Sequence, residues 1–369
     1  MAVSTLLRRL ALPLACGALA LAPAPAAADD LVYAKLASYF EALRTQNNIP
    51  GLAVAIAGRT DLVWVRGFGY QNLERLVAMR PDTPVPVDGL TETFTATILL
   101  RCDEEHTQPL DDLAPVVPTS GTVPVGGSAA SVRPQTIRQV LQHSTVDASD
   151  QTTYAYRPDR VAALQPVIEA CRDARYEVSL ADLFNRAGMT SSVPGTAAAA
   201  ATVAEEGYPD EATLDRYRQL LARRATMYEA ETGRRPAPVT AAPTPLTPAQ
   251  GAISTAVDLA LFDISLRSGA FASADTLVAA WRPPVDAATG RALPRGTGWF
   301  VQAYNGETVV WQVGQSDAGS SSLLVSLPAR GLTLAMVANS AGLSKPFALT
   351  DGDITRSPFA RVFLSLFTR

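Results

Sequence analysis

Residues that could carry out catalysis are scarce in this chain, because it contains only two histidines and two lysines. A serine that a lysine activates from the same helix needs the spacing Ser-x-x-Lys, since residues three apart share a helix face. No serine stands three residues before Lys35 or Lys345, and the patterns G-x-S-x-G, H-E-x-x-H and G-x-x-x-x-G-K-[ST] do not occur. These absences argue against a nucleophile elbow, a zinc site and a phosphate-binding loop. His106 and His143 are the only histidines, so few residues could serve as the base of a Ser-His-Asp triad. We also expect no metal and no cofactor.

The most strongly patterned stretch runs from residue 81 to residue 110, and its centre reads DGLTETFTA from Asp88 to Ala96. Leu90, Phe94 and Leu100 recur at roughly helical spacing, which predicts a buried helix that opens near Asp88.

This stretch resembles the nucleophile helix of the serine β-lactamase and penicillin-binding-protein superfamily, in the class C-like branch that also contains esterases and D-amino-acid peptidases. The family pattern is P-D-T-x-F-x-x-x-S-x-T-K-T-F-T-A. Without a gap, the matching positions are Pro81, Asp82, Thr83, Thr91, Thr93, Phe94, Thr95 and Ala96, while Val85 replaces the first phenylalanine. The nucleophilic serine falls on Gly89 and the lysine on Glu92. The resemblance therefore implies the frame of a nucleophile helix without its two reactive residues.

These two replacements change the chemistry that the helix can support. Gly89 has no side chain and cannot form an acyl-enzyme, and Glu92 places an anion where the family has a cation. At about 4 Å and an effective dielectric constant near 20, one such charge is worth on the order of 4 kcal/mol to a carboxylate ligand. We therefore expect the site to repel penicillin-like anions.

The family's other two motifs are altered as well. Tyr156-Arg157-Pro158 stands where the family has Y-x-N, so the asparagine that would hold a substrate amide is Pro158, which has no side-chain donor. Gln312 replaces the lysine or histidine of K/H-x-G and carries no positive charge, while its glycine persists as Gly314. Tyr156 is the one retained polar motif residue, either as a proton relay or as a loop aromatic packed on the helical part. The resemblance implies a vestigial cleft formed by Gly89, Glu92, Tyr156, Pro158, Gln312 and Gly314.

The order of predicted elements indicates an α+β fold, with one antiparallel sheet built from both chain ends, flanking helices and an inserted helical subdomain. We expect strands at residues 52–57, 62–68, 309–311, 321–326 and 332–338, and helices at residues 31–47, 161–169, 180–186, 211–231 and 357–367. Residues 29–369 then form one β-lactamase-related domain, in which residues 29–112 and 249–369 are the α/β part and residues 113–248 a mainly helical insert. In residues 135–143, similar to the family's "TIRxLLxHTSG" helix, we interpret His143 as a structural residue.

The N-terminus has the pattern of a secretory signal peptide over residues 1–28. Arg8 and Arg9 precede an apolar run at residues 10–21, and small residues at 26–28 suit cleavage. We expect a periplasmic or secreted protein without a membrane span after cleavage, and we do not favour lipidation at Cys16. Cys102 and Cys171 can pair in an oxidising compartment, but their positions on two separate predicted helices favour two buried thiols. The net charge of −4 and the pI near 5.4 argue against nucleic-acid binding.

Two main functions remain open from the sequence. The first is a non-catalytic family member, a binding or scaffolding protein whose cleft takes a cell-wall-derived or peptide-like ligand; its oligomeric state is not predicted. The second is a hydrolase of the esterase, peptidase or β-lactamase kind, with Glu92 and Tyr156 acting on a water in the space that Gly89 leaves. A third, an active enzyme with misaligned motifs, is disfavoured because no Ser-x-x-Lys occurs.

Overall fold

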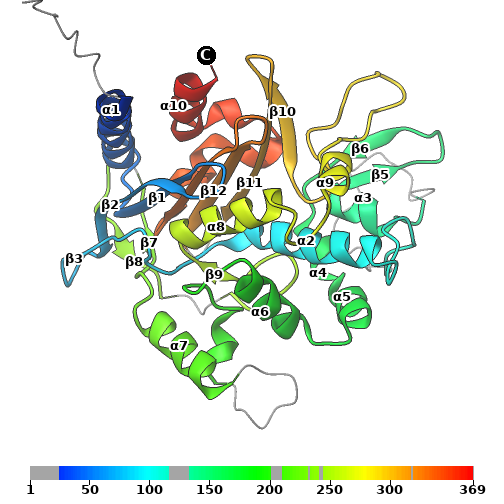
Figure 1. Ribbon diagram of the computed structural model, residues 1–369, viewed down its shortest axis with the longest axis horizontal. Coiled ribbons are helices and arrows are strands. Elements are labelled where there is room, and N and C mark those ends of the chain that lie inside the picture. Colours follow the sequence, from blue (N-terminus) through cyan, green and yellow to red (C-terminus); the bar gives the residue numbers. More distant parts are fainter. Residues whose placement is uncertain are drawn as a thin grey trace, which may run out of the picture.

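The structure, a computed structural model, describes residues 25–115, 133–200, 210–231, 233–240, 244–316 and 319–368. Its centre is a seven-stranded antiparallel sheet in the order β10-β11-β12-β13-β1-β2-β3 (Figure 1). The strands are β1 Gly51–Ala57, β2 Leu62–Asn72, β3 Val77–Ala78, β10 Phe300–Tyr304, β11 Glu307–Gln315, β12 Ser321–Leu327 and β13 Leu332–Ala338. Strands from both chain ends thus meet in one sheet, because β1 pairs with β13, as the sequence predicted.

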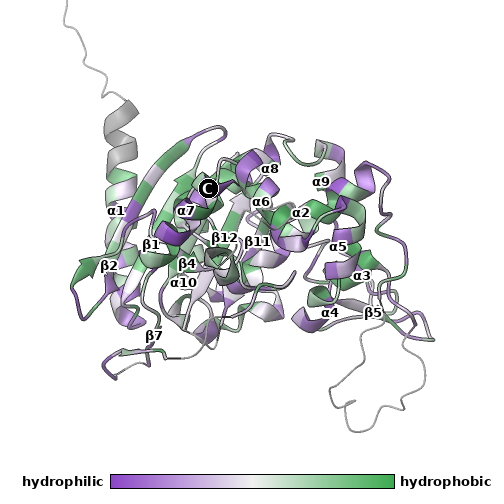
Figure 2. Ribbon diagram, turned by 90° about the horizontal axis from the view of Figure 1, so that it is seen from below, coloured by the Kyte–Doolittle hydropathy of each residue, from purple (hydrophilic) through white to green (hydrophobic). Residues whose placement is uncertain are grey.

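The central strands are buried on both faces, which explains why their sequences are almost continuously apolar. Every residue of β1 and β12 is buried. Helices α1 (Pro25–Gln46) and α10 (Pro358–Phe367) pack on each other, and their apolar residues share a core with one face of the sheet. Helix α8 (Ala256–Arg267) covers the other face. Hydrophobic residues accordingly concentrate in the central strands and in the helices around them (Figure 2).

Helix α2 (Thr91–Glu104) follows the short 3-10 turn η1 (Asp88–Leu90) and shares a hydrophobic core with all the remaining described α-helices except α7, which packs in a separate cluster. These remaining helices are α3 Ile137–Leu141, α4 Pro158–Ala162, α5 Gln165–Arg172, α6 Tyr176–Arg186, α7 Glu211–Ala222 and α9 Ala274–Ala280. Short strands accompany them, namely β4 Val85–Pro86, β5 Ser144–Val146, β6 Thr152–Tyr154, β7 Tyr228–Glu229, β8 Ala237–Pro238 and β9 Ile253–Ser254. Almost every residue of α2 is buried, so the helix predicted to open near Asp88 lies in the interior.

Two helix predictions were wrong in their extent. The helix expected over residues 161–169 is divided into α4 and α5, because Pro166 cannot donate the main-chain hydrogen bond that would continue α4. The helix expected over residues 211–231 ends at Ala222. Beyond it the chain bonds to other segments instead, with Thr226 N donating to the Gln71 carbonyl and Tyr228 N donating to the Asn339 carbonyl.

The expectation of two buried thiols was also wrong. Cys102 of α2 and Cys171 of α5 form a disulfide, with their Cα atoms 6.1 Å apart. Helices α2 and α5 pack against each other, so the separate positions in the sequence come together in space.

The expected signal peptide and Cys16 lie mostly outside the described residues, and α1 begins at Pro25. Within the part of the chain that the structure describes, no helix combines the length and the apolar character that crossing a bilayer requires. The division into an α/β part and a helical insert stays a prediction.

Candidate functional site

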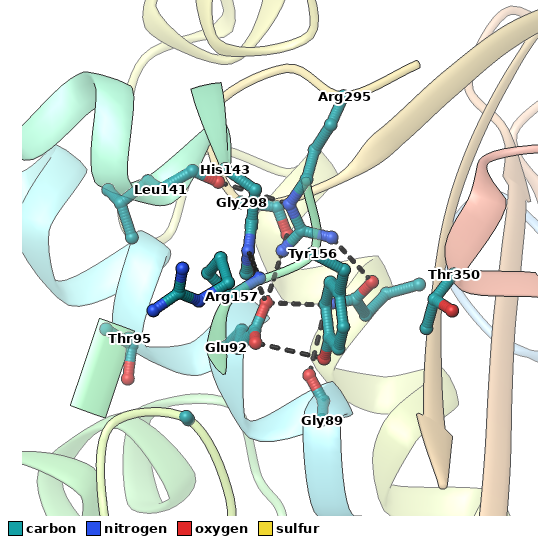
Figure 3. A network of polar contacts seen from close by, with 12 residues as sticks. Gly89, Glu92, Thr95, Leu141, His143, Tyr156, Arg157, Arg295, Gly298 and Thr350 are labelled. Atoms are coloured by element: carbon teal, nitrogen blue, oxygen red, sulfur yellow. Dashed lines mark hydrogen bonds and ion pairs between the residues drawn. The ribbon is translucent and has the colours of Figure 1, made fainter. Parts of the chain in front are cut away.

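Glu92 lies at the centre of the candidate site, in the first turn of α2, and its side chain is buried (Figure 3). Arg295 Nη2 lies 2.5 Å from Glu92 Oε2, and His143 Nε2 lies 3.0 Å from the same oxygen. Gln312 Nε2 donates to Oε2 at 3.3 Å, and the Tyr156 hydroxyl donates to Oε1 at 3.0 Å. Both carboxylate oxygens therefore have partners from this protein.

Arg295 is the cation of the site, and it is fully buried. Its Nε donates to the Leu141 carbonyl at 3.1 Å and its Nη1 to Gln312 Oε1 at 3.0 Å. The guanidinium carbon also lies 4.7 Å from the centroid of the Phe300 ring, a cation–π distance. An isolated bridge between residues 295 and 300 holds the arginine beside the start of β10.

His143 is neutral in this arrangement. The Arg157 main-chain N–H donates to His143 Nδ1 at 2.7 Å, so Nδ1 must be the unprotonated nitrogen and Nε2 donates to Glu92. Burial lowers the pKa of His143 below its usual value, although the Glu92 charge opposes that shift. The imidazole stacks on the Tyr156 ring at a centroid distance of 4.7 Å.

The charge on Glu92 is maintained despite its burial. Burial alone would raise the pKa of this carboxyl, but His143, the Arg295 charge and the Tyr156 hydrogen bond outweigh burial and hold the pKa below the ordinary value. Burial and the Glu92 charge raise the pKa of Tyr156 well above its ordinary value. The site therefore holds a carboxylate and a guanidinium ion, with a neutral phenol and a neutral imidazole beside them.

The position of the missing nucleophile is filled by Tyr156. A Cβ atom added at Gly89 would lie 2.7 Å from the Tyr156 hydroxyl oxygen and 3.1 Å from the Val313 carbonyl oxygen. Since real Cβ atoms essentially never approach another heavy atom within 3.0 Å, a serine at residue 89 would require Tyr156 to move.

The turn that carries Gly89 includes a second buried carboxyl group. Asp88 is 1% exposed, and the Ser320 hydroxyl donates to its Oδ2 at 2.5 Å. Burial raises the pKa of Asp88 to about 7. Its φ of +48° places it in the left-handed region, which aspartate tolerates better than most residues.

Strand β11 supplies two of the predicted cleft residues. Gln312 Nε2 donates to the Gly89 carbonyl at 3.0 Å in addition to its contact with Glu92. A Cβ atom at Gly314 would overlap the Val87 carbonyl oxygen, so this glycine allows the strand to approach the segment before η1.

The structure thus brings Gly89, Glu92, Tyr156 and Gln312 together, with Gly314 beside them. Pro158 instead occupies the first position of α4, and among the described residues it forms no hydrogen bond or ion pair with Glu92. Sequence reasoning missed Arg295 entirely and treated His143 as merely structural. The available signal was Glu92 itself, because a buried carboxylate requires a cation, but any of many arginines could have supplied it.

This arrangement is ill suited to acyl transfer. Gly89 supplies no hydroxyl or thiol, and the hydroxyls of Thr91 and Thr93 are buried and hydrogen-bonded to main chain. Glu92 is buried and has a lowered pKa. A general base needs access to the water from which it takes a proton. Within the described residues, no group of three or more histidine, cysteine, aspartate or glutamate side chains could hold a metal ion.

The sheet, the helix that opens at the site and the flanking helices define a β-lactamase/transpeptidase fold. The family model for Beta-lactamase matches residues 36–355, and the chain belongs to this family. No curated protein sequence matches the chain.

Solved structures agree with this fold at low sequence identity. The octameric penicillin-binding protein homologue from Pyrococcus abyssi is 18% identical with a TM-score of 0.67, over 90% of this chain and 77% of that chain. FmtA from Staphylococcus aureus is 13% identical with a TM-score of 0.66, over 92% of this chain and 90% of that chain. The D-alanine carboxypeptidase AmpC from Burkholderia cenocepacia is 18% identical with a TM-score of 0.63, over 91% of this chain and 99% of that chain. At these identities the likeness shows the fold alone.

Proposed function

We propose that this member of the β-lactamase family has lost serine hydrolase activity and acts as an exported binding or scaffolding protein in the periplasm or outside the cell. The observation that supports the loss of activity is that the protein's own side chains occupy the position of the family's nucleophile. Glu92 forms a buried ion pair with Arg295, and Tyr156 takes the space beside Gly89 that a nucleophile needs.

The alternative of water activation by Glu92 and Tyr156 has little support. A general base that works near neutral pH needs a pKa close to the working pH, whereas the pKa of Glu92 lies below its ordinary value. The space beside Gly89 is limited by the Tyr156 hydroxyl and the Val313 carbonyl. Should a hydrolytic activity be found and Glu92→Gln leave it unchanged, this mechanism would be excluded.

The proposed ligand of a non-catalytic member is a cell-wall-derived or peptide-like molecule, by analogy with the family. Export rests on the residue pattern before residue 29. N-terminal sequencing of protein secreted by a bacterial host should begin near Asp29, and an uncleaved cytoplasmic product would contradict export.

The loss of activity is tested by covalent labelling. We expect a fluorescent penicillin and a fluorophosphonate probe to leave the purified protein unlabelled. Under the same conditions the penicillin should label an active penicillin-binding protein and the fluorophosphonate an active serine esterase. A labelled band that survives denaturation would overturn the proposal, and mapping the adduct would identify the nucleophile.

A further inference from the structure

His143 makes two contacts that only a neutral imidazole can make together (Figure 3). Its Nδ1 accepts the Arg157 main-chain N–H at 2.7 Å, and its Nε2 lies 3.0 Å from a Glu92 carboxylate oxygen. The N–H that Nδ1 accepts belongs to the peptide unit that joins Tyr156 to Arg157. The position of Tyr156 beside Gly89 therefore depends on an unprotonated Nδ1.

A proton on Nδ1 would turn this hydrogen bond into a contact between two donors. A histidinium ion carries an N–H on both ring nitrogens, so the new proton would point at the Arg157 N–H across 2.7 Å. The contact between Nε2 and Glu92 would persist, because Glu92 is an anion. Protonation thus breaks the contact that holds Tyr156 and strengthens the contact that holds the imidazole.

The imidazole is the fixed side of this contact. The His143 N–H donates to the Val140 carbonyl and the His143 carbonyl accepts the Ala155 N–H, both at 3.0 Å. The φ of His143 is +52°, a left-handed conformation that persists where the surrounding contacts fix it. His143 is buried, whereas Ala155 is exposed and Arg157 is partly exposed. We therefore expect the main chain of residues 156–157 to move when the two donors repel each other.

The surroundings of His143 determine the pH range in which this happens. Burial lowers the pKa of His143 below its ordinary value of 6.5. Among the charged groups that face the ring, Glu92 of α2 and Asp159 of α4 act against this shift, and Arg295, before β10, adds to it. The Tyr156 phenol, whose ring stacks on the imidazole, has a raised pKa and stays neutral. His143 is therefore neutral at pH 7 and gains its second proton in acid.

We propose that Tyr156 is a plug that acid releases: protonation of His143 repels the peptide unit between Tyr156 and Arg157 and draws the Tyr156 ring away from Gly89. This inference rests on the proposed function, because it states how the filled cleft of a binding protein admits a ligand. With the hydroxyl of Tyr156 withdrawn, the space beside Gly89 is bounded by the Val313 carbonyl and the Gly314 Cα atom. The cleft is then closed at neutral pH and open in acid.

Nuclear magnetic resonance of the mature protein with 15N-labelled histidine observes the protonation directly. The chain has only two histidines, so the variant His106→Gln assigns the His143 signals. At about pH 7.5 we expect His143 to carry its proton on Nε2 alone. Between about pH 6.5 and pH 4 it should gain a second proton on Nδ1.

Amide hydrogen exchange on the same protein follows the peptide unit. Protection of the Arg157 amide, corrected for intrinsic exchange at each pH, should fall by at least about tenfold over the range in which His143 titrates. The amides of β1, at the centre of the sheet, should stay protected throughout.

His143→Asn is the matched variant. The asparagine oxygen can accept the Arg157 N–H, and asparagine tolerates a positive φ and does not titrate. Its Arg157 amide should therefore stay protected in acid. Asp88 and Asp258, with pKa values of about 7 and about 6, are present in both proteins, so a difference between the proteins belongs to residue 143.

Three results would overturn the proposal. The first is a His143 that keeps a single proton down to about pH 4, and the second is a doubly protonated His143 without loss of protection at Arg157. The third is an equal loss of protection in His143→Asn. The first two results come from the natural protein, so the test does not depend on the folding of the variant. None of them involves acylation, so failure here and failure of the proposed loss of activity can be told apart.

Discussion

Glu92 and Arg295 depend on each other for their charges, because their side chains are 1% and 0% exposed. Arg295→Met would leave the Glu92 carboxylate buried without its cation, which costs about 3–5 kcal/mol in free energy of unfolding. The double variant Glu92→Gln/Arg295→Met should recover most of that loss, because it removes both charges. Urea unfolding of the natural protein, both single variants and the double variant measures the coupling.

The matched control is the partly exposed ion pair between Arg330 and Glu307. Arg330→Met should cost less than about 1 kcal/mol, because water screens that pair. If Arg295→Met costs no more than this control, the ion pair at the site does not have the role assigned to it.

Tyr156 and Gly89 compete for the same space. Gly89→Ala places a Cβ atom against the Tyr156 hydroxyl, and we expect it to lower the free energy of unfolding by about 1–3 kcal/mol. Tyr156→Phe removes that hydroxyl together with its hydrogen bond to Glu92. The two single variants each lose some free energy of unfolding. The double variant Gly89→Ala/Tyr156→Phe should lose less than the sum of these two losses, and the difference should exceed about 0.5 kcal/mol. Strict additivity in thermal or urea unfolding would show that the two residues do not interfere.

Most residues of this site could be located from the sequence, because the resemblance placed Gly89, Glu92, Tyr156 and Gln312 in three separated motifs. Arg295 could not be located, since it lies 203 residues from Glu92 and matches no motif position. Only the three-dimensional structure shows which arginine compensates the reversed charge at residue 92.

At the scale of elements, the turn η1 should make stability depend on pH through Asp88. The pKa of this buried carboxyl is raised to about 7 in the folded protein, from 3.8 for an ordinary aspartate. An acid with a raised pKa holds its proton more firmly when folded, so the stability it provides is fully present below about pH 4 and is lost as the pH rises through 7. When the pH is raised from 5 to 8, the free energy of unfolding of the natural protein should fall by about 2–4 kcal/mol relative to that of Asp88→Asn.

Asparagine suits this comparison because it has no charge and tolerates the positive φ of residue 88. Asp258, whose pKa burial raises to about 6, contributes its own pH dependence to both proteins and cancels in the difference. Parallel stability curves for the natural protein and Asp88→Asn would mean that Asp88 does not titrate as described.

The disulfide connects α2 with α5 across 69 residues of chain. A loop of that length restricts the unfolded chain by about 4 kcal/mol in the chain-entropy model. Dithiothreitol should lower the free energy of unfolding of the natural protein by up to that amount and leave Cys102→Ala/Cys171→Ala unaffected. Two free thiols in the unreduced mature protein would contradict the pairing.

The sequence was less informative about the ends of elements than about their existence. The periodicity of residues 161–169 indicated one helix, and only the geometry of Pro166 divides it. The helix predicted to reach residue 231 ends at Ala222, and beyond it hydrogen bonds to β2 and to Asn339, the residue after β13, replace helical hydrogen bonds. Tertiary contacts of this kind leave no local pattern.

At the scale of the whole molecule, the fold survives the loss of the residues that define the family's chemistry. The sheet built from both chain ends was predicted correctly, because strongly apolar strands and family landmarks lie at both ends. Packing of β11, α2 and α8 does not require a serine or a lysine at the site, so fold and activity can separate. The two restoring substitutions Gly89→Ser/Glu92→Lys should accordingly fail to restore acylation, since Tyr156 would still obstruct the serine and Arg295 would repel the lysine.

The central claim is that this site cannot form an acyl-enzyme. Intact-mass measurement tests it most directly, after incubation of the natural protein with a penicillin and, separately, with a fluorophosphonate. We predict an unchanged mass for the natural protein in both cases. The controls are an active penicillin-binding protein, which keeps a long-lived acyl-enzyme with penicillin, and an active serine esterase, which the fluorophosphonate should modify completely. A stoichiometric mass increase on the natural protein would contradict the claim.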